Sequence, residues 1–119
     1  MRNYRDIQVW ARSHLLTLAV YHATTAFPRD GLYGLTSQIR RASSSIPANI
    51  AEGCGRSSNA ELARFLEIAS GSASELDYHL LLAKDLDLLT AEEHESMVDE
   101  LAQIRKMLNA FIQKLRATA

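Results

Sequence analysis

The stretch QIRRASSSIPANIAEGCGRSS, residues 38–58, combines a helical pattern with residues that usually interrupt helices. Its apolar residues recur at spacings of three and four, as on one face of a helix. They are Ile39, Ala42, Ile46 and Ile50. Pro47 lies inside this pattern, where it cannot donate a hydrogen bond to the carbonyl of Ser43 and its ring crowds that carbonyl. The stretch therefore predicts an amphipathic helix over about residues 35–54, kinked at Pro47.

The other face of this helix is polar. It carries Arg41, Ser45, Asn49, Glu52 and Arg56. Glu52 precedes Arg56 by four residues, which is the favourable orientation for a helical ion pair. Two interpretations of this face stay open. One is a polar network against another helix or subunit, through Ser45, Asn49, Glu52 and Glu75. The other is a ligand or nucleic-acid contact through Arg40, Arg41 and Arg56.

Small residues around Pro47 and at the end of the helix suggest how its backbone is completed. The hydroxyl of Ser43 or Ser44 is expected to satisfy backbone groups that the proline loosens. Gly53 or Gly55 is expected to supply the left-handed residue that ends many helices.

Three further helices are predicted around the first one. One runs over about residues 6–26 and ends at Phe27-Pro28, because the residue before proline avoids the helical region. Its predicted inner stripe is Ile7, Trp10, Ala11, Leu15, Leu18, Ala19 and His22. The next two begin at Ser58 and Thr90, each followed three residues later by the glutamate of a capping box.

The two later helices carry regular apolar faces. The helix after Ser58 is expected to bury Leu62, Phe65, Leu66, Ala69, Ala73, Leu76, Leu80 and Ala83. The helix after Thr90 is expected to bury Met97, Leu101, Ile104, Leu108, Phe111 and Leu115. Since no strand pattern competes and the connections are short, the predicted fold is all-α. It is an antiparallel up-down-up-down four-helix bundle that forms a single domain over residues 1–119.

Two features of these helices predict close packing and self-association. The segment ASGSAS, residues 69–74, lacks bulk, so a neighbouring backbone is expected to approach closely at Gly71. The apolar residues beside the main faces exceed what one small bundle covers. They are Leu81, Leu82, Leu86, Leu88, Leu89, Val98, Met107 and Ile112. Exposed apolar patches of this kind usually mark a partner surface, which predicts a homo-oligomer.

The composition is that of a water-soluble domain. Hydrophobic residues make up 47% and charged residues 23% of the 119, and no apolar run is long enough for a membrane span. The N-terminus lacks the apolar region of a signal peptide, and a single cysteine, Cys54, favours a reducing cytoplasm. Residues 1–60 hold seven Lys/Arg against three acids, whereas residues 61–119 hold six against eleven. This split predicts either one basic and one acidic side of the bundle or two ordinary solvated faces.

Motifs for catalysis, metals or cofactors are missing from the sequence. A di-iron bundle requires a Glu-x-x-His motif on each of two helices. Here Glu75 and His79 lie four residues apart, and the sequence has no second copy of the pair. Cys54 has no neighbouring base and is interpreted as a small apolar residue. The GCGRSS segment has neither the spacing nor the preceding strand of a phosphate-binding loop. We therefore expect no enzyme, no metal and no cofactor.

Several motifs resemble those of a known family. They are Asp6, Val9 and Trp10; Phe27-Pro28; Tyr33-Gly34-Leu35; Gln38 to Ala42; Ser45 to Gly53; Phe65-Leu66; Ile68-Ala69; Gly71-Ser72; and Glu75-Leu76. They cover almost the whole chain, and SIPANIAEG is the most specific of them. The chain resembles the four-helix bundle proteins encoded by intervening sequences of bacterial large-subunit ribosomal RNA genes. It is similar, too, to the accessory variability proteins of diversity-generating retroelements.

The resemblance implies a ring-like homopentamer without known enzymatic activity. The retroelement members are basic, bind nucleic acid and cooperate with a reverse transcriptase, so RNA or DNA is the implied partner. The present chain has a net charge of −1, but fivefold repetition of Arg40-Arg41 would build a local basic surface. The sequence thus predicts an oligomeric scaffold or nucleic-acid-associated module. The alternative is a purely structural ring-forming adaptor that binds no nucleic acid.

Overall fold

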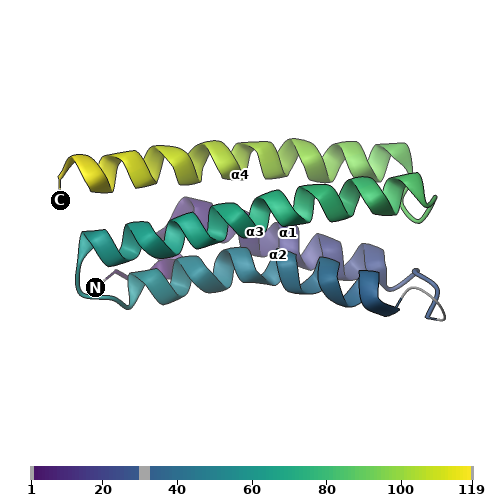
Figure 1. Cartoon of the computed structure of the whole chain (residues 1–119), viewed down its shortest axis with the longest axis horizontal. Coiled ribbons are helices and arrows are strands. Elements are labelled where there is room, and N and C mark those ends of the chain that lie inside the picture. The colour runs from purple at the N-terminus through teal and green to yellow at the C-terminus, as the bar shows by residue number, and fades with distance from the viewer. Residues whose placement is uncertain (1, 30–32, 119) are drawn as a thin grey trace.

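The computed structural model describes residues 2–29 and 33–118, which form helices and no strands. The elements are a short 3-10 helix η1 (Tyr4–Asp6) and the helices α1 (Gln8–Thr24), α2 (Tyr33–Cys54), α3 (Asn59–Asp85) and α4 (Ala91–Ala117). Figure 1 shows the four long helices lying side by side, with both ends of the chain at the left. The predicted all-α fold is confirmed, and the four helices are consistent with a bundle.

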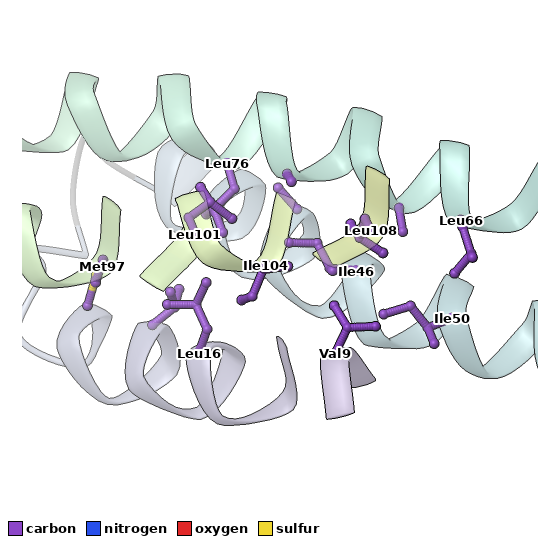
Figure 2. Close-up of a cluster of buried hydrophobic side chains, with 14 of the residues drawn as sticks. Val9, Leu16, Ile46, Ile50, Leu66, Leu76, Met97, Leu101, Ile104 and Leu108 are labelled. Carbon is purple, nitrogen blue, oxygen red and sulfur yellow. The ribbon is translucent and has the colours of Figure 1, made fainter. Parts of the chain in front are cut away.

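The helices meet around one cluster of buried apolar side chains. α1 packs against α2 and α4, and α3 packs against the same two helices. Figure 2 shows buried side chains from all four helices, among them Leu16, Ile46, Leu76 and Ile104. The predicted inner faces of α2 and α3 are confirmed. That of α4 is confirmed except near its end, where Ile112 is buried and Phe111 only partly so.

The predicted inner face of α1 is wrong. Leu15 and Leu18 are 63% and 52% exposed, and the rest of the predicted stripe is exposed or only partly buried. The buried side is Val9, Ser13, Leu16, Thr17, Val20 and Thr24. Its three hydroxyls donate hydrogen bonds to carbonyls one turn earlier in α1, so these polar residues can be buried without an unsatisfied group. Hydrophobicity alone therefore selected the wrong side of this helix.

The helix ends follow the predicted caps only in part. Thr90 and Glu93 form the reciprocal capping box. Ser58 accepts from the amide of Glu61, but the Glu61 carboxylate pairs with Arg64 instead of returning to the cap. Neither Gly53 nor Gly55 has a left-handed backbone, so the expectation for these two glycines is wrong.

A left-handed residue lies just after the end of α3. Asp87 has a φ of 61°. Its amide donates to Lys84, and the amide of Leu88 donates to Ala83. These two bonds are those of a Schellman motif, with aspartate where glycine is usual. The turn helps to place Leu89 in the core, where it is 5% exposed, so Leu89 is not one of the surplus apolar residues.

The carbonyl that Pro47 leaves without an amide donor is satisfied from another helix. The hydroxyl of Thr17, in α1, lies 3.0 Å from the Ser43 carbonyl oxygen and 2.9 Å from that of Ser13, so its single proton is shared between the two carbonyls. The side chains of Ser43 and Ser44 donate to Arg40 and Arg41, one turn earlier. The predicted role of the two serines at this carbonyl is therefore wrong, because their hydroxyls reach back along their own helix. Thr17 makes Pro47 compatible with a buried position in α2.

The close approach predicted at Gly71 occurs at Gly53 instead. A Cβ atom on Gly71 would have no neighbour within 4 Å, whereas one on Gly53 would lie 2.8 Å from Leu62 Cδ1 and 2.9 Å from Phe65 Cβ. Gly71 lies on the exposed side of α3. Gly53 lies where the end of α2 meets the beginning of α3, so the absence of a side chain matters there.

An ion pair joins α1 to α4. Arg12 donates from Nε and Nη2 to the two carboxylate oxygens of Glu100, at 2.7 and 2.8 Å. This forked geometry is the strong form of an arginine–carboxylate pair. The hydrogen bond from Arg12 lowers the pKa of Glu100 from its ordinary value.

Glu100→Gln is expected to destabilise the fold at neutral pH and to have little effect in acid. A carboxylate whose pKa is lowered by folding contributes stability above its unfolded pKa, and this contribution is lost as the pH falls through its folded pKa. The Glu100 side chain is 35% exposed, so solvent screening limits its effect to at most about 1 kcal/mol. Urea unfolding at pH 7 and near pH 3 measures it. Glu95→Gln, an exposed site on the same helix, is the control. If the difference in unfolding free energy between the wild type and Glu100→Gln were the same at both pH values, the loss would come from packing and not from the ion pair.

No helix formed by the described residues is long and apolar enough to cross a membrane. The apolar residues that stay exposed lie mainly on two helices. They are Leu15, Leu18 and Tyr21 on α1, and Ile68, Tyr78 and Leu81 on α3, with Leu86 at the α3 C-cap. Leu82, Leu88, Val98 and Met107 are partly buried.

Candidate functional site

Arg40 is held in a fixed position between α1 and α2. Its Nε donates to Thr24 Oγ1 at 2.8 Å, and its Nη2 donates to the Tyr21 carbonyl at 3.4 Å. The guanidinium also lies over the Tyr21 ring, 4.9 Å from its centroid. Thr24 can accept this bond because its own hydroxyl proton goes to Val20 and Tyr21 carbonyls. Arg40 is therefore an ordered cation whose remaining N–H groups are available.

Arg40 and Arg41 line a surface hollow of about 500 Å³ between the two helices. The other lining residues are Tyr21, Thr36, Ser37 and Ser44. A second hollow of about 450 Å³ shares Thr36 and Arg40 with the first and is further lined by Thr24, Thr25, Phe27, Pro28 and Arg29. None of the described lining residues carries a carboxylate. Three arginines and several hydroxyls thus surround two joined hollows, an arrangement suited to an anion.

Arg56 does not lie with the other two predicted arginines. It pairs with Glu52 at 3.5 Å and lies over the ring of Phe65, 4.8 Å from the centroid. Arg64 lies 4.5 Å from the centroid of the same ring. Arg40 and Arg41 take no part in the ion pairs formed among the described residues. The structure therefore separates Arg56 from the Arg40–Arg41 hollow.

A small polar network lies between α2 and α3. The Ser45 hydroxyl and the Ser72 hydroxyl are 2.8 Å apart, and the Asn49 amide donates to the Ser45 carbonyl and hydroxyl at 2.8 and 2.9 Å. Ser45, Asn49 and Ser72 are all partly buried. These contacts join two helices of one chain.

The two glutamates predicted for this network bind elsewhere. Glu52 pairs with Arg56, and Glu75 lies 3.3 Å from His79 Nε2. Both carboxylates are 57% exposed. His79 Nδ1 is buried and has no hydrogen-bond partner among the described residues. The structure therefore does not bring Glu52, Glu75 and a histidine into one cleft.

The remaining reactive residues do not form a recognisable catalytic or metal site. Within residues 2–29 and 33–118, no three His, Cys, Asp or Glu side chains are grouped to hold a metal ion. Burial raises the pKa of the Cys54 thiol, which keeps it in the less nucleophilic protonated form.

Part of the hollow could have been found in the sequence. Ser37, Arg40, Arg41 and Ser44 follow spacings of three, one and three, which place them on one side of a helix. Sequence reasoning instead grouped Arg41 with Arg56, along a longer stripe. Tyr21 and Thr24 come from α1 and Thr25 is its C-cap. Their contribution depends on how α1 is rotated against α2.

Comparison with known proteins identifies the family. Residues 5–110 match the model of the 23S rRNA-intervening sequence protein family. A crystal structure from Bacteroides thetaiotaomicron, of a protein with unknown function from the S23 ribosomal protein family, is 27% identical with a TM-score of 0.81. The alignment covers 88% of the present chain and 95% of the other. No curated protein matches. The chain belongs to the 23S rRNA-intervening sequence protein family.

Proposed function

We propose that this protein is a non-enzymatic, oligomeric four-helix bundle that acts in the cytoplasm as a scaffold or binding module for nucleic acid. The observation that carries the proposal is the pair of joined hollows around Arg40, where arginines and hydroxyls gather without a described carboxylate. Arginine binds phosphate oxygens through a planar fork of N–H donors, and hydroxyls supply further contacts. A phosphate backbone is therefore the ligand that this surface suits best.

The architecture included in this proposal is an up-down-up-down bundle with a kink at Pro47. Cross-helix contacts support antiparallel neighbours. Ser45 contacts Ser72, whereas Gly53, later in α2, lies against Leu62, earlier in α3. In the same way Arg105 contacts Ser74, whereas Arg116, later in α4, pairs with Glu67, earlier in α3. Pro47 inside α2 supports the kink, because it removes one helical hydrogen bond.

Self-association is supported by the positions of the exposed apolar residues. Leu15 and Leu18 lie on α1, whereas Tyr78 and Leu81 lie on α3. Among the described residues α1 and α3 do not pack against each other, since each packs against α2 and α4. The two apolar surfaces therefore belong to opposite sides of the bundle. When two different surfaces of identical chains bind each other, the assembly is head-to-tail and closes into a ring if the rotation allows. A homopentameric ring is one such assembly.

A purely structural ring-forming adaptor is the second candidate. It is favoured by the net charge of −1, which gives no overall attraction to nucleic acid. In that case Glu52 and the other polar residues of α2, together with Arg56 just after it, serve the packing of helices and subunits. Binding of nucleic acid separates the two candidates.

The assembly is tested by light scattering of the wild type and of Leu15→Glu/Leu18→Glu. We expect a wild-type mass several times the 13.2 kDa of one chain and a variant close to one chain, because the new charges cannot be buried at the interface. Gln103→Glu, at an exposed position of α4, adds charge outside the two apolar surfaces and should leave the mass unchanged. A monomeric wild type would refute self-association. Nucleic-acid binding is tested on the same preparation, as described below.

A further inference from the structure

The two hollows adjoin each other, and together they are called the groove. They share Thr36 and Arg40, so the lining runs from Ser44 and Arg41, past Arg40, to Arg29. From Ser37 to Ser44 the α2 side of the groove rises about 10 Å, at about 1.5 Å per residue. Arg40 and Arg41 line the first hollow and Arg29 the second. Several cationic side chains in adjoining hollows suit a chain of phosphates better than a single small anion.

The groove also contains an aromatic ring. Tyr21 is 41% exposed and lines the first hollow beside Arg40. Proteins that bind single-stranded nucleic acid combine a positively charged groove with aromatic side chains on which bases stack. Tyr21, Arg40 and Arg41 supply both parts of this combination within one hollow.

The position of the arginines argues against a duplex ligand. Duplex DNA is usually read by an element that enters the major groove, about 12 Å wide, from outside. Here hydrogen bonds to Thr24 and Tyr21 keep Arg40 between α1 and α2. Arg40 therefore lines a hollow and does not project from the surface. A flexible single strand can enter such a hollow, whereas the rigid backbone of a duplex can touch only its rim.

We propose that this groove binds a short segment of single-stranded nucleic acid, with Arg40 and Arg41 on successive phosphates. The Arg40 guanidinium lies over one face of the Tyr21 ring, and a base stacks on the opposite face. Arg29 extends the same path beyond Arg40. Arg56 is not part of it, since Arg56 pairs with Glu52 near the other end of α2. This inference rests on the proposed nucleic-acid function and specifies its strand state and its residues.

The test is fluorescence anisotropy of the assembled wild-type protein with labelled single-stranded RNA, single-stranded DNA and the matched DNA duplex. Arg41→Ala is the central variant, because Arg41 is exposed and no described contact of the fold depends on its side chain. We expect it to weaken single-strand binding about tenfold and to reduce the slope of log K against log salt by about 0.7, the value for one lost phosphate contact on a single strand.

Three further variants locate the ligand. Tyr21→Ala should weaken binding about tenfold through lost stacking, whereas Tyr21→Phe should remain near the wild type. Arg56→Ala removes an arginine outside the groove, just beyond the end of α2, and should change affinity by less than about twofold. Light scattering of each variant shows whether the assembly is intact. A lower mass for Tyr21→Ala alone would assign that residue to subunit contacts and overturn its stacking role.

The outcomes distinguish the inference from the proposed function. Equal losses of single-strand affinity for Arg41→Ala and Arg56→Ala, or tighter binding of the duplex, would overturn the assignment of binding to the groove. Nucleic-acid binding as such would still hold. The absence of salt-dependent binding to any of the three probes would overturn both and favour the structural adaptor. Preference for RNA over DNA would support the groove and add a contact to the 2′-hydroxyl.

Discussion

Gly53→Ala is expected to destabilise the fold by about 1–3 kcal/mol, although alanine is the better helix former. The new methyl group would lie 2.8 Å from Leu62 Cδ1 and 2.9 Å from Phe65 Cβ. Leu62 can move its terminal methyl group, but Phe65 Cβ is fixed by the backbone of α3. Relief therefore requires α2 and α3 to separate where they meet, at the expense of contacts of Leu62 and Leu66, which are 3% and 0% exposed.

Gly71→Ala is the matched control, and it should have the opposite sign. A methyl group there meets nothing within 4 Å, so the gain in helix propensity, about 1 kcal/mol, is realised in full. Urea unfolding of the wild type and of the two variants measures both changes. Equal effects at the two glycines would mean that the helices adjust freely at Gly53, and that its small size is not a packing requirement.

The faces of three helices could be predicted from the sequence, and that of α1 could not. In α2, α3 and α4 the buried residues are apolar except for Ser43 and His79, so hydrophobic periodicity and burial largely coincide. In α1 the buried side includes Ser13, Thr17 and Thr24. Their hydroxyls bond to their own helix, which makes them as acceptable in a core as small apolar residues. A prediction based on polarity assigns such residues to the solvent-exposed face, and it therefore exchanges the buried and exposed faces of α1.

The two glycine expectations failed for a related reason. A small residue in a helix is compatible with close packing, but the sequence does not state which small residue faces a neighbour. Gly71 lies between the buried Ala69 and Ala73, yet its own position is exposed. Gly53 lies near a helix end, where a role in capping was expected and a close contact with Phe65 is found.

The candidate groove combines predictable and unpredictable parts. Arg40 and Arg41 were recognised as candidate contacts from the sequence, and they lie together in the structure. Arg56 follows Arg41 by fifteen residues, about 22 Å along a helix, so a common stripe did not imply a common site. The contribution of Tyr21 and Thr24 follows from the true orientation of α1. Because the prediction placed the wrong face of α1 toward the core, it did not identify the α1 side of the groove.

Thr17→Val is expected to destabilise the wild type by about 1–3 kcal/mol, because it leaves the buried Ser43 carbonyl without its hydrogen-bond donor. The substitution keeps the shape of the side chain and removes only the hydroxyl that donates to Ser43 at 3.0 Å. Thr17→Ser retains the hydroxyl and is the control, with a smaller loss from the missing methyl group. Urea unfolding at neutral pH measures all three proteins.

The same substitution should cost less in a Pro47→Ala background, and this coupling is the decisive measurement. Alanine at position 47 restores a backbone amide one turn after Ser43, so the carbonyl gains a donor within α2 and no longer depends on Thr17. We expect the two substitutions to be coupled by about 1 kcal/mol, within the range found for residues that share a partner. An equal cost of Thr17→Val in both backgrounds would show that the carbonyl is satisfied in another way. If Thr17→Val has no effect in the Pro47→Ala background, the Thr17 hydroxyl of α1 compensates for the hydrogen bond that Pro47 removes from α2. Pro47 and Thr17 then act as one unit of the fold.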